Sequence, residues 1–250
     1  MGLVAPHPRT DAGRNTMPAA SKTASRTVVA AQLAVFLVAA AILIPAVSPT
    51  EAIAGVAWVK LAFVARIAAL VALALGMLRQ RSLGWSDIGL SRPNWRRFAI
   101  ALPAGLLLVV AISAIARAIA VQTGLPVADY SMFAAIKGDL GEYLFWVLPV
   151  SIGTAAFGEE LIFRGFVTDA VRRLLGGSNI VVLVTALTTQ AGIFGILHFY
   201  QGFGGMIVAG GTGLALGLTW LIAGRNMWAG IVLHALLDGT AMTAFYLGYA

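Results

Sequence analysis

Residues 143–175 are YLFWVLPVSIGTAAFGEELIFRGFVTDAVRRLL, an apolar stretch that keeps a helical pattern across two adjacent glutamates. A helix needs about 20 apolar residues to cross roughly 30 Å of hydrocarbon. The stretch is longer than that, so we expect a membrane-spanning helix whose C-terminal end projects from the bilayer. The glycine-rich segment 176–179 then ends it, as glycine commonly ends helices.

The composition of the whole chain supports a bilayer as its solvent. Of 250 residues, 60% are hydrophobic and 11% are charged, and the mean hydropathy is +0.90, whereas a soluble protein is about a quarter charged. The net charge of +7 does not indicate a nucleic-acid partner, because Lys and Arg lie in short segments between apolar runs. Without cysteine, disulfides, thiolate zinc sites and cysteine nucleophiles are excluded.

Six further apolar runs of membrane-spanning length complete the pattern. The predicted fold is therefore all-α, a polytopic bundle of about seven transmembrane helices. The six runs are residues 28–47, 55–78 (with Lys60 near one end and Arg66 further in), 98–120, 180–198, 204–223 and 227–248.

The chain divides into a tail and two groups of helices. Residues 1–26 are predicted to be a disordered cytoplasmic tail, because they lack an apolar period. Residues 27–140 hold the first transmembrane helices, and residues 141–248 hold the residues that suggest chemistry. The first apolar run could instead be a signal peptide, with Ala46 and Ser48 resembling a cleavage site. Its apolar core exceeds the usual 7 to 15 residues, which favours a membrane anchor.

The basic residues predict an orientation. If each span reverses direction, the tail, the loop 79–97, Arg172 with Arg173, and Arg225 all fall on one side. The positive-inside rule then gives a cytoplasmic N-terminus and an external C-terminus. The composition, rich in Ala and Gly, hints at a bacterial source and hence a bacterial cell membrane.

The motif FGEELIFR at 157–164 places two carboxylates inside an apolar helix. Each such charge costs at least about 2.5 kcal/mol near the bilayer centre, so each needs a partner or a wet cavity. Glu160 and Arg164 are i and i+4 and can form an ion pair. Glu159 has no cation at i+3 or i+4 and must find partners on another helix. It is the carboxylate left free for chemistry.

Two of the three histidines, His198 and His234, also lie in apolar segments. Phe194 shares a helix face with His198, and Asp238 shares one with His234, where it can fix the tautomer of the imidazole. A hairpin around 176–178 puts Glu159 and His198 within roughly 5 Å of the same depth. Glu and His side chains from separate helices are therefore expected to meet.

A purely structural interpretation competes with a chemical one. The four groups could form a satisfied polar lattice, or line the ion path of a transporter. Four ionisable groups on three helices exceed what packing requires, and neither an inverted repeat nor a pair of broken helices supports a transporter. The small residues Gly205, Ala209, Gly213 and Gly217 are, by contrast, interpreted as a helix-packing ridge.

Three motifs together resemble the CAAX prenyl protease and bacteriocin-processing family of intramembrane peptidases (the CPBP or Abi family). EExxxR is similar to Glu159, Glu160 and Arg164, FxxxH to Phe194 and His198, and HxxxN/D to His234 and Asp238. The resemblance covers about residues 141–245, with a fainter echo in the segment DIGL at 87–90. Position 238 is Asn in the eukaryotic prenyl-protein branch.

This resemblance implies an intramembrane endopeptidase that hydrolyses a peptide bond of a membrane-associated or prenylated-type polypeptide. Glu159, assisted by His198, would activate a water, while His234 and residue 238 would stabilise the oxyanion. An ionised Asp238 cannot donate a hydrogen bond, so it is expected to orient His234. The implied catalytic set is Glu159, Glu160, Arg164, His198, His234 and Asp238.

Two alternatives stay open. Glu159, His198 and His234 could be the protein ligands of a catalytic zinc with an open water position, or the site could work without metal. The same fold could also serve a non-catalytic membrane immunity or scaffold protein. The sequence lacks HExxH and the serine and aspartyl signatures of other intramembrane proteases. The expected partners are a polypeptide substrate at the membrane and the lipid bilayer, and no nucleic acid.

Overall fold

The computed structural model describes residues 24–53, 55–126, 130–177 and 179–249. Over these residues the structure contains helices and no strands, and seven helices are long and apolar enough to cross a membrane. The predicted all-α membrane bundle is thus confirmed, and the predicted spans agree with the observed ones to within a few residues. Residues 1–23 of the predicted tail lie outside the described residues. The seven spans are Arg26–Ala46, Ala57–Gln80, Trp95–Gln122, Leu140–Leu175, Ile180–Leu197, Phe199–Ile222 and Trp228–Leu247.

Each span consists of one or more helical elements. The elements are α1 (Arg26–Leu43), η1 (Ile44–Ala46), α2 (Pro49–Ile53), α3 (Ala57–Gln80), α4 (Trp95–Gln122), η2 (Ser131–Ile136), α5 (Leu140–Phe145), η3 (Trp146–Glu159), η4 (Leu161–Val167), α6 (Thr168–Leu175), α7 (Ile180–Leu197), η5 (Phe199–Gln201), α8 (Gly202–Ile222) and α9 (Trp228–Leu247). Two short elements, α2 and η2, lie between spans.

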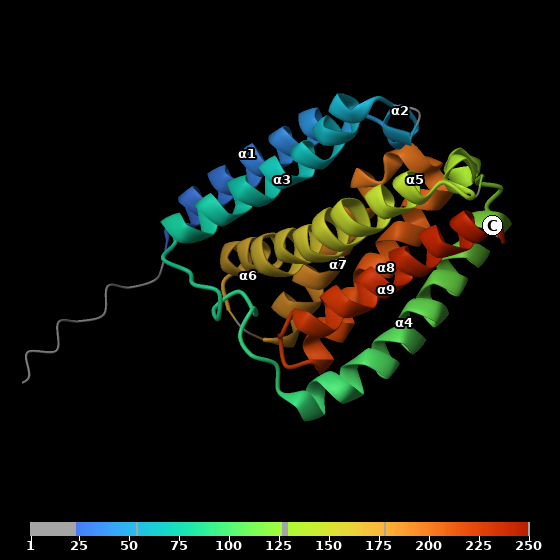
Figure 1. Cartoon of the computed structure of the whole chain (residues 1–250). Coiled ribbons are helices and arrows are strands. Elements are labelled where there is room, and N and C mark those ends of the chain that lie inside the picture. The colour runs from blue at the N-terminus through green and yellow to red at the C-terminus, as the bar shows by residue number, and fades with distance from the viewer. Residues whose placement is uncertain (1–23, 54, 127–129, 178, 250) are drawn as a thin grey trace, which may run out of the picture.

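The bundle is layered around the long span α5–η3–η4–α6 (Figure 1). The antiparallel pair α1 and α3 packs on one side of this span, and α7 and α9 contact it on the other. Helix α8 packs between α7 and α4, so α4 forms the opposite edge of the molecule (Figure 1). Aromatic side chains fill the first interface, where the rings of Phe36 and Phe166 lie 5.0 Å apart. The central span is therefore enclosed by helices from both halves of the chain.

The sequence pattern suggested a regular α-helix for the central span, but the structure differs from this expectation. Elements η3 and η4 have the wider π-helical turn, which often occurs at functional sites. Pro149 lies inside η3 and lacks the N–H that a regular helix would use. Ser151 donates its hydroxyl to the carbonyl of Trp146 at 2.8 Å, and Thr168 donates to that of Phe163 at 2.7 Å. These hydroxyls bind carbonyls five residues earlier, which supports the widened turn.

The loop between α3 and α4 holds the start of α9 in place. Within the DIGL segment, Gly89 accepts a hydrogen bond from the backbone of Met227 at 2.9 Å. Gly89 has φ +95°, and a Cβ there would lie 2.5 Å from the carbonyl oxygen of Arg225. Only glycine therefore permits this close approach. The faint sequence echo at 87–90 marks a segment that positions α9, and with it His234.

Basic segments that are far apart in sequence meet at one end of the bundle. The guanidinium of Arg26, at the start of α1, lies beside Gly176, which follows α6. The guanidinium of Arg97, near the start of α4, lies beside Gly224, which follows α8. The connections that the charge pattern assigned to one side of the membrane thus share one end of the molecule.

Candidate active site

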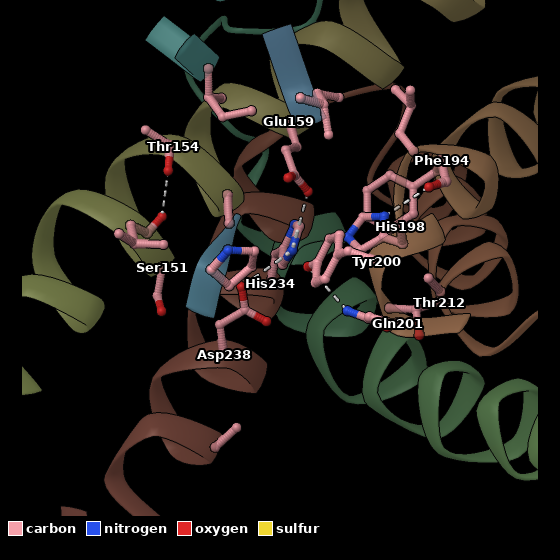
Figure 2. Close-up of a pocket in the computed structure, with 18 of the residues that line it drawn as sticks. Ser151, Thr154, Glu159, Phe194, His198, Tyr200, Gln201, Thr212, His234 and Asp238 are labelled. Atoms are coloured by element: carbon pink, nitrogen blue, oxygen red, sulfur yellow. Dashed lines mark hydrogen bonds and ion pairs between the residues drawn. The ribbon is translucent and has the colours of Figure 1, made fainter. Parts of the chain in front are cut away.

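A cavity of about 410 Å³ lies among the helices, and it brings together the residues singled out from the sequence. Glu159 from η3, His198 from the end of α7, and His234 and Asp238 from α9 all line it (Figure 2). The rest of its wall is largely aromatic and aliphatic. Groups on three helices therefore face one cavity, as the hairpin argument predicted.

Glu159 is the carboxylate that faces the cavity. Its side chain is 20% exposed, and its Oε2 lies 3.9 Å from Nε2 of His234. The prediction that Glu159 finds its partner on another helix is thus confirmed. The neighbouring Glu160 does not line the cavity, and its side chain is fully buried. The two adjacent carboxylates consequently have different environments.

Glu160 and Arg164 form the predicted ion pair, with Arg164 Nη1 2.9 Å from Glu160 Oε1 and both side chains fully buried. Arg164 also donates from Nη2 to the carbonyl of Gly213 at 2.7 Å. The pair has a further partner that the sequence did not suggest, because Glu160 Oε1 lies 3.3 Å from Nδ1 of His234. Glu160 therefore links the buried arginine to the imidazole in the cavity.

The close contact between α9 and Glu160 depends on Gly230. A Cβ at this position would lie 2.7 Å from Oε2 of Glu160, closer than van der Waals contact allows. The carboxylate has no free space to move into, since its Oε1 is held by Arg164 and His234. Glycine at this position lets the helix bearing His234 approach the carboxylate.

Three carboxylates surround His234. Glu160 lies at Nδ1, while Glu159 and Asp238 face Nε2 at 3.9 and 3.6 Å. An ionised carboxylate only accepts hydrogen bonds, so Nδ1 carries a hydrogen toward Glu160. The sequence predicted that Asp238 would orient the imidazole; in the structure the carboxylate that is hydrogen-bonded to the ring is Glu160, and Asp238 lies 3.6 Å from Nε2.

His198 has a defined orientation. Its Nδ1 lies 2.7 Å from the carbonyl oxygen of Phe194, and since a carbonyl only accepts, Nδ1 is the donor. The ring stacks on that of Phe194 with centroids 4.5 Å apart, so the predicted pairing at i and i+4 is confirmed. In neutral His198 the remaining Nε2 carries a lone pair. His198 and Glu159 line the same cavity without forming an ion pair with each other, which allows a water to bridge them.

Several cavity residues were not recognised as site residues from the sequence. Tyr200 follows His198 in the short turn η5, and its ring centroid lies 5.8 Å from that of the imidazole. Gln201 donates to the Tyr200 hydroxyl at 3.1 Å, and Ser151 and Arg66 also line the cavity. For the hydroxyl groups of Tyr200 and Ser151, the sequence offered only a weak indication of a role in the site. For Arg66 the indication was clear, because a charged residue inside an apolar span is costly and is usually paired or functional.

The three residues considered as zinc ligands do not form a ready ligand set in this structure. Within the residues that the structure describes, no three His, Asp or Glu side chains converge closely enough to hold a metal ion. Nδ1 of His234 is directed to Glu160 and Nδ1 of His198 to a backbone carbonyl, which leaves Nε2 of each ring outside these bonds, as in histidines that bind a metal. Glu159, His198 and His234 border one cavity, and the steps proposed below are those of the metal-free alternative.

Comparison with known proteins gives one informative match. Neither the curated proteins nor the solved structures include a significant match to the chain. A family model described as "Type II CAAX prenyl endopeptidase Rce1-like" matches residues 141–240, the segment that carries Glu159, Glu160, Arg164, His198, His234 and Asp238. Over residues 141–240, which carry all six of these residues, the chain is thus similar to the Rce1-like family of type II CAAX prenyl endopeptidases.

Proposed function

We propose that this protein is an intramembrane endopeptidase that hydrolyses a peptide bond of a membrane-associated or prenylated-type polypeptide. The family supports CAAX-type intramembrane protease activity in general. The observation that carries the specific proposal is the position of His234, which has Glu160 at one ring nitrogen and Glu159 and Asp238 near the other, inside the cavity. In this proposal residues 141–248 form the catalytic unit and residues 27–140 support it.

Glu159 and His198 are proposed to activate the attacking water. The water lies between the Glu159 carboxylate and Nε2 of His198, and its oxygen attacks the peptide carbonyl as Glu159 takes its proton. A carboxylate within hydrogen-bonding reach of the water can act as its general base. When the C–N bond breaks, Glu159 returns the proton to the leaving amine.

His234 is proposed to stabilise the oxyanion. When protonated, its Nε2–H donates to the negative charge that develops on the carbonyl oxygen. Glu160 holds Nδ1, and Asp238 balances the imidazolium charge. In this scheme Glu160 and Arg164 are positioning residues, because they act on the reaction through His234 and do not line the cavity.

The membrane orientation is part of the proposal. The protein is an integral multi-pass membrane protein by its seven apolar helices, and its basic connections share one end of the bundle. The positive-inside rule places that end in the cytoplasm, which gives a cytoplasmic N-terminus. We assign the protein to a bacterial cell membrane on its composition, rich in Ala and Gly.

The test is cleavage of membrane peptides by the purified protein. Peptides ending in a prenylated cysteine motif, and unprenylated controls, are incubated with the wild type and with Glu159→Gln, and the products are identified by mass spectrometry. Glu51→Gln, at an exposed position of helix α2 that does not line the cavity, is the matched control. We expect cleavage by the wild type and the control, and none by Glu159→Gln. Equal activity of Glu159→Gln would refute the assignment, and no cleavage by any form would favour the non-catalytic immunity or scaffold alternative.

A further inference from the structure

Arg66 has no role in the mechanism above, although it lines the same cavity. It lies inside the membrane span Ala57–Gln80 and is 8% exposed. Among the described residues that line the cavity, it is the only arginine or lysine. A buried cation in a membrane is costly and is usually paired or functional. The contacts of the Arg66 guanidinium therefore show whether the protein itself supplies partners for its charge and its N–H donors.

The protein satisfies Arg66 only in part. Its Nη1 donates to the carbonyl of Ile44 at 2.7 Å, and its guanidinium lies over the ring of Phe63, 4.1 Å from the centroid. Its Nε is buried without a hydrogen-bond partner, and none of the described carboxylates forms an ion pair with it. The Ile44 carbonyl and the Phe63 ring fix the orientation of the guanidinium, and its Nε–H remains without an acceptor.

Three other cations inside or next to the spans behave differently. Arg164 pairs with Glu160, Arg81 with Asp169 at 3.1 Å, and Lys60 with Glu142. Each of these is accounted for as a structural ion pair between or within helices. Among the described arginines and lysines that are buried, Arg66 is the one without a carboxylate partner, and it faces the cavity. An anionic ligand in the cavity would supply the missing partner.

Arg66 also lies close to the proposed catalytic carboxylate. Helices α3 and η3 cross at Gly158, where a Cβ would lie 3.7 Å from the side chain of Ile67. Ile67 follows Arg66 in sequence, and Gly158 precedes Glu159. The two charged residues thus flank one helix crossing and border one cavity. A ligand bound by Arg66 is within a short distance of the reacting groups.

We propose that Arg66 binds the C-terminal α-carboxylate of the polypeptide substrate; this inference rests on the proposed function. An α-carboxyl group has a pKa of about 3.3 to 3.7 and is ionised at neutral pH. The planar guanidinium can donate two parallel hydrogen bonds to it. Since Arg66 is the one arginine or lysine among the described lining residues, the free end is directed to the α3 wall. The peptide bond placed at Glu159 is then one near the C-terminus.

The test uses two peptides that differ in one group, a free C-terminal carboxylate or a C-terminal amide. Their binding to Glu159→Gln protein is measured by fluorescence titration in phosphatidylcholine nanodiscs, where turnover does not interfere. We expect the acid to bind about 10- to 100-fold more tightly than the amide, the range for hydrogen bonds to charged groups. Equal binding of the two peptides overturns the inference, and this comparison needs no change at Arg66.

A second comparison assigns the preference to Arg66. Adding Arg66→Gln should bring the acid's affinity down to that of the amide, and adding Arg66→Lys should leave an intermediate preference. Arg79→Gln is the matched control, because Arg79 is an exposed cation on the same helix outside this cavity. It should keep the full preference. A preference that survives Arg66→Gln in folded protein overturns the inference.

The outcomes also separate this inference from the proposed function. A binding preference together with a wild type that cleaves neither peptide would refute the endopeptidase and leave the carboxylate site standing. Cleavage of both peptides at equal rates, with equal binding, would refute the carboxylate site alone. The titrations are repeated with phosphatidylglycerol in the nanodiscs. Binding of this lipid that depends on Arg66, with no preference between the peptides, would assign the site to a lipid phosphate and overturn the inference.

Discussion

Replacing Arg164 by alanine removes the cation that neutralises a fully buried glutamate. The variant loses the ion pair with Glu160 at 2.9 Å and the hydrogen bond to the Gly213 carbonyl at 2.7 Å. Breaking a buried pair by removing one partner costs about 3 to 5 kcal/mol. His234 still contacts Glu160, and Gln190 still donates to Gly213 at 3.0 Å. We therefore expect a loss near the lower limit, about 3 kcal/mol of unfolding free energy.

The assay is unfolding by dodecyl sulfate in mixed micelles, followed by the tryptophan fluorescence. The control is Arg173→Ala, which breaks another i, i+4 pair on the same span, with Asp169 at 2.7 Å. That pair is about a quarter exposed, and Asp169 keeps Arg81 as a partner, so the loss should be below about 1 kcal/mol. Adding Glu160→Gln to Arg164→Ala should restore part of the stability. Equal losses in the two single variants would refute the reasoning, and a stable but inactive Arg164→Ala would make Arg164 a catalytic residue.

Three further predictions concern the site and the topology. Gly230→Ala should displace the buried carboxylate of Glu160, lowering the unfolding free energy by about 1 to 3 kcal/mol; unchanged stability in the same assay would contradict the contact. Asp238→Asn should keep most of the activity, because the asparagine amide can itself donate a hydrogen bond to the oxyanion. A chelator should have little effect on the wild type, because the proposed steps use no metal; stoichiometric zinc that is lost and regained together with activity would show otherwise. A reporter fused after Arg173 should be cytoplasmic and one after Ala250 external, and reporters on the same side would contradict the orientation.

Local spacing predicted the features that depend on a single helix. The pair of Glu160 with Arg164 and the stacking of Phe194 on His198 both follow from the i, i+4 geometry, and both are present. The lengths of the apolar runs likewise predicted the seven spans, because bilayer thickness fixes the length of a helix that must cross it. The three-motif resemblance is confirmed by the family match over residues 141–240.

Features that depend on contacts between distant segments could not be predicted in this way. Glu160 meets His234 across 74 residues of sequence, and Arg66 reaches the cavity from a helix that carries no family motif. Both contacts depend on how the helices pack, which a hydropathy pattern does not specify. The π-helical turn of η3 was also missed, since Pro149 and the hydroxyl of Ser151 suggest a local irregularity but not its length.

The central claim is that Glu159 activates the water that attacks the peptide bond. It is tested most directly by the kcat of Glu159→Gln on a cleaved peptide, with peptide binding used to verify that the variant is folded. A general base contributes about 100- to 10,000-fold to the rate, and the amide keeps the shape of the carboxylate but cannot take the proton. We predict a fall in kcat of that size with peptide affinity little changed. A kcat close to that of the wild type, in a variant that binds the peptide normally, would contradict the account.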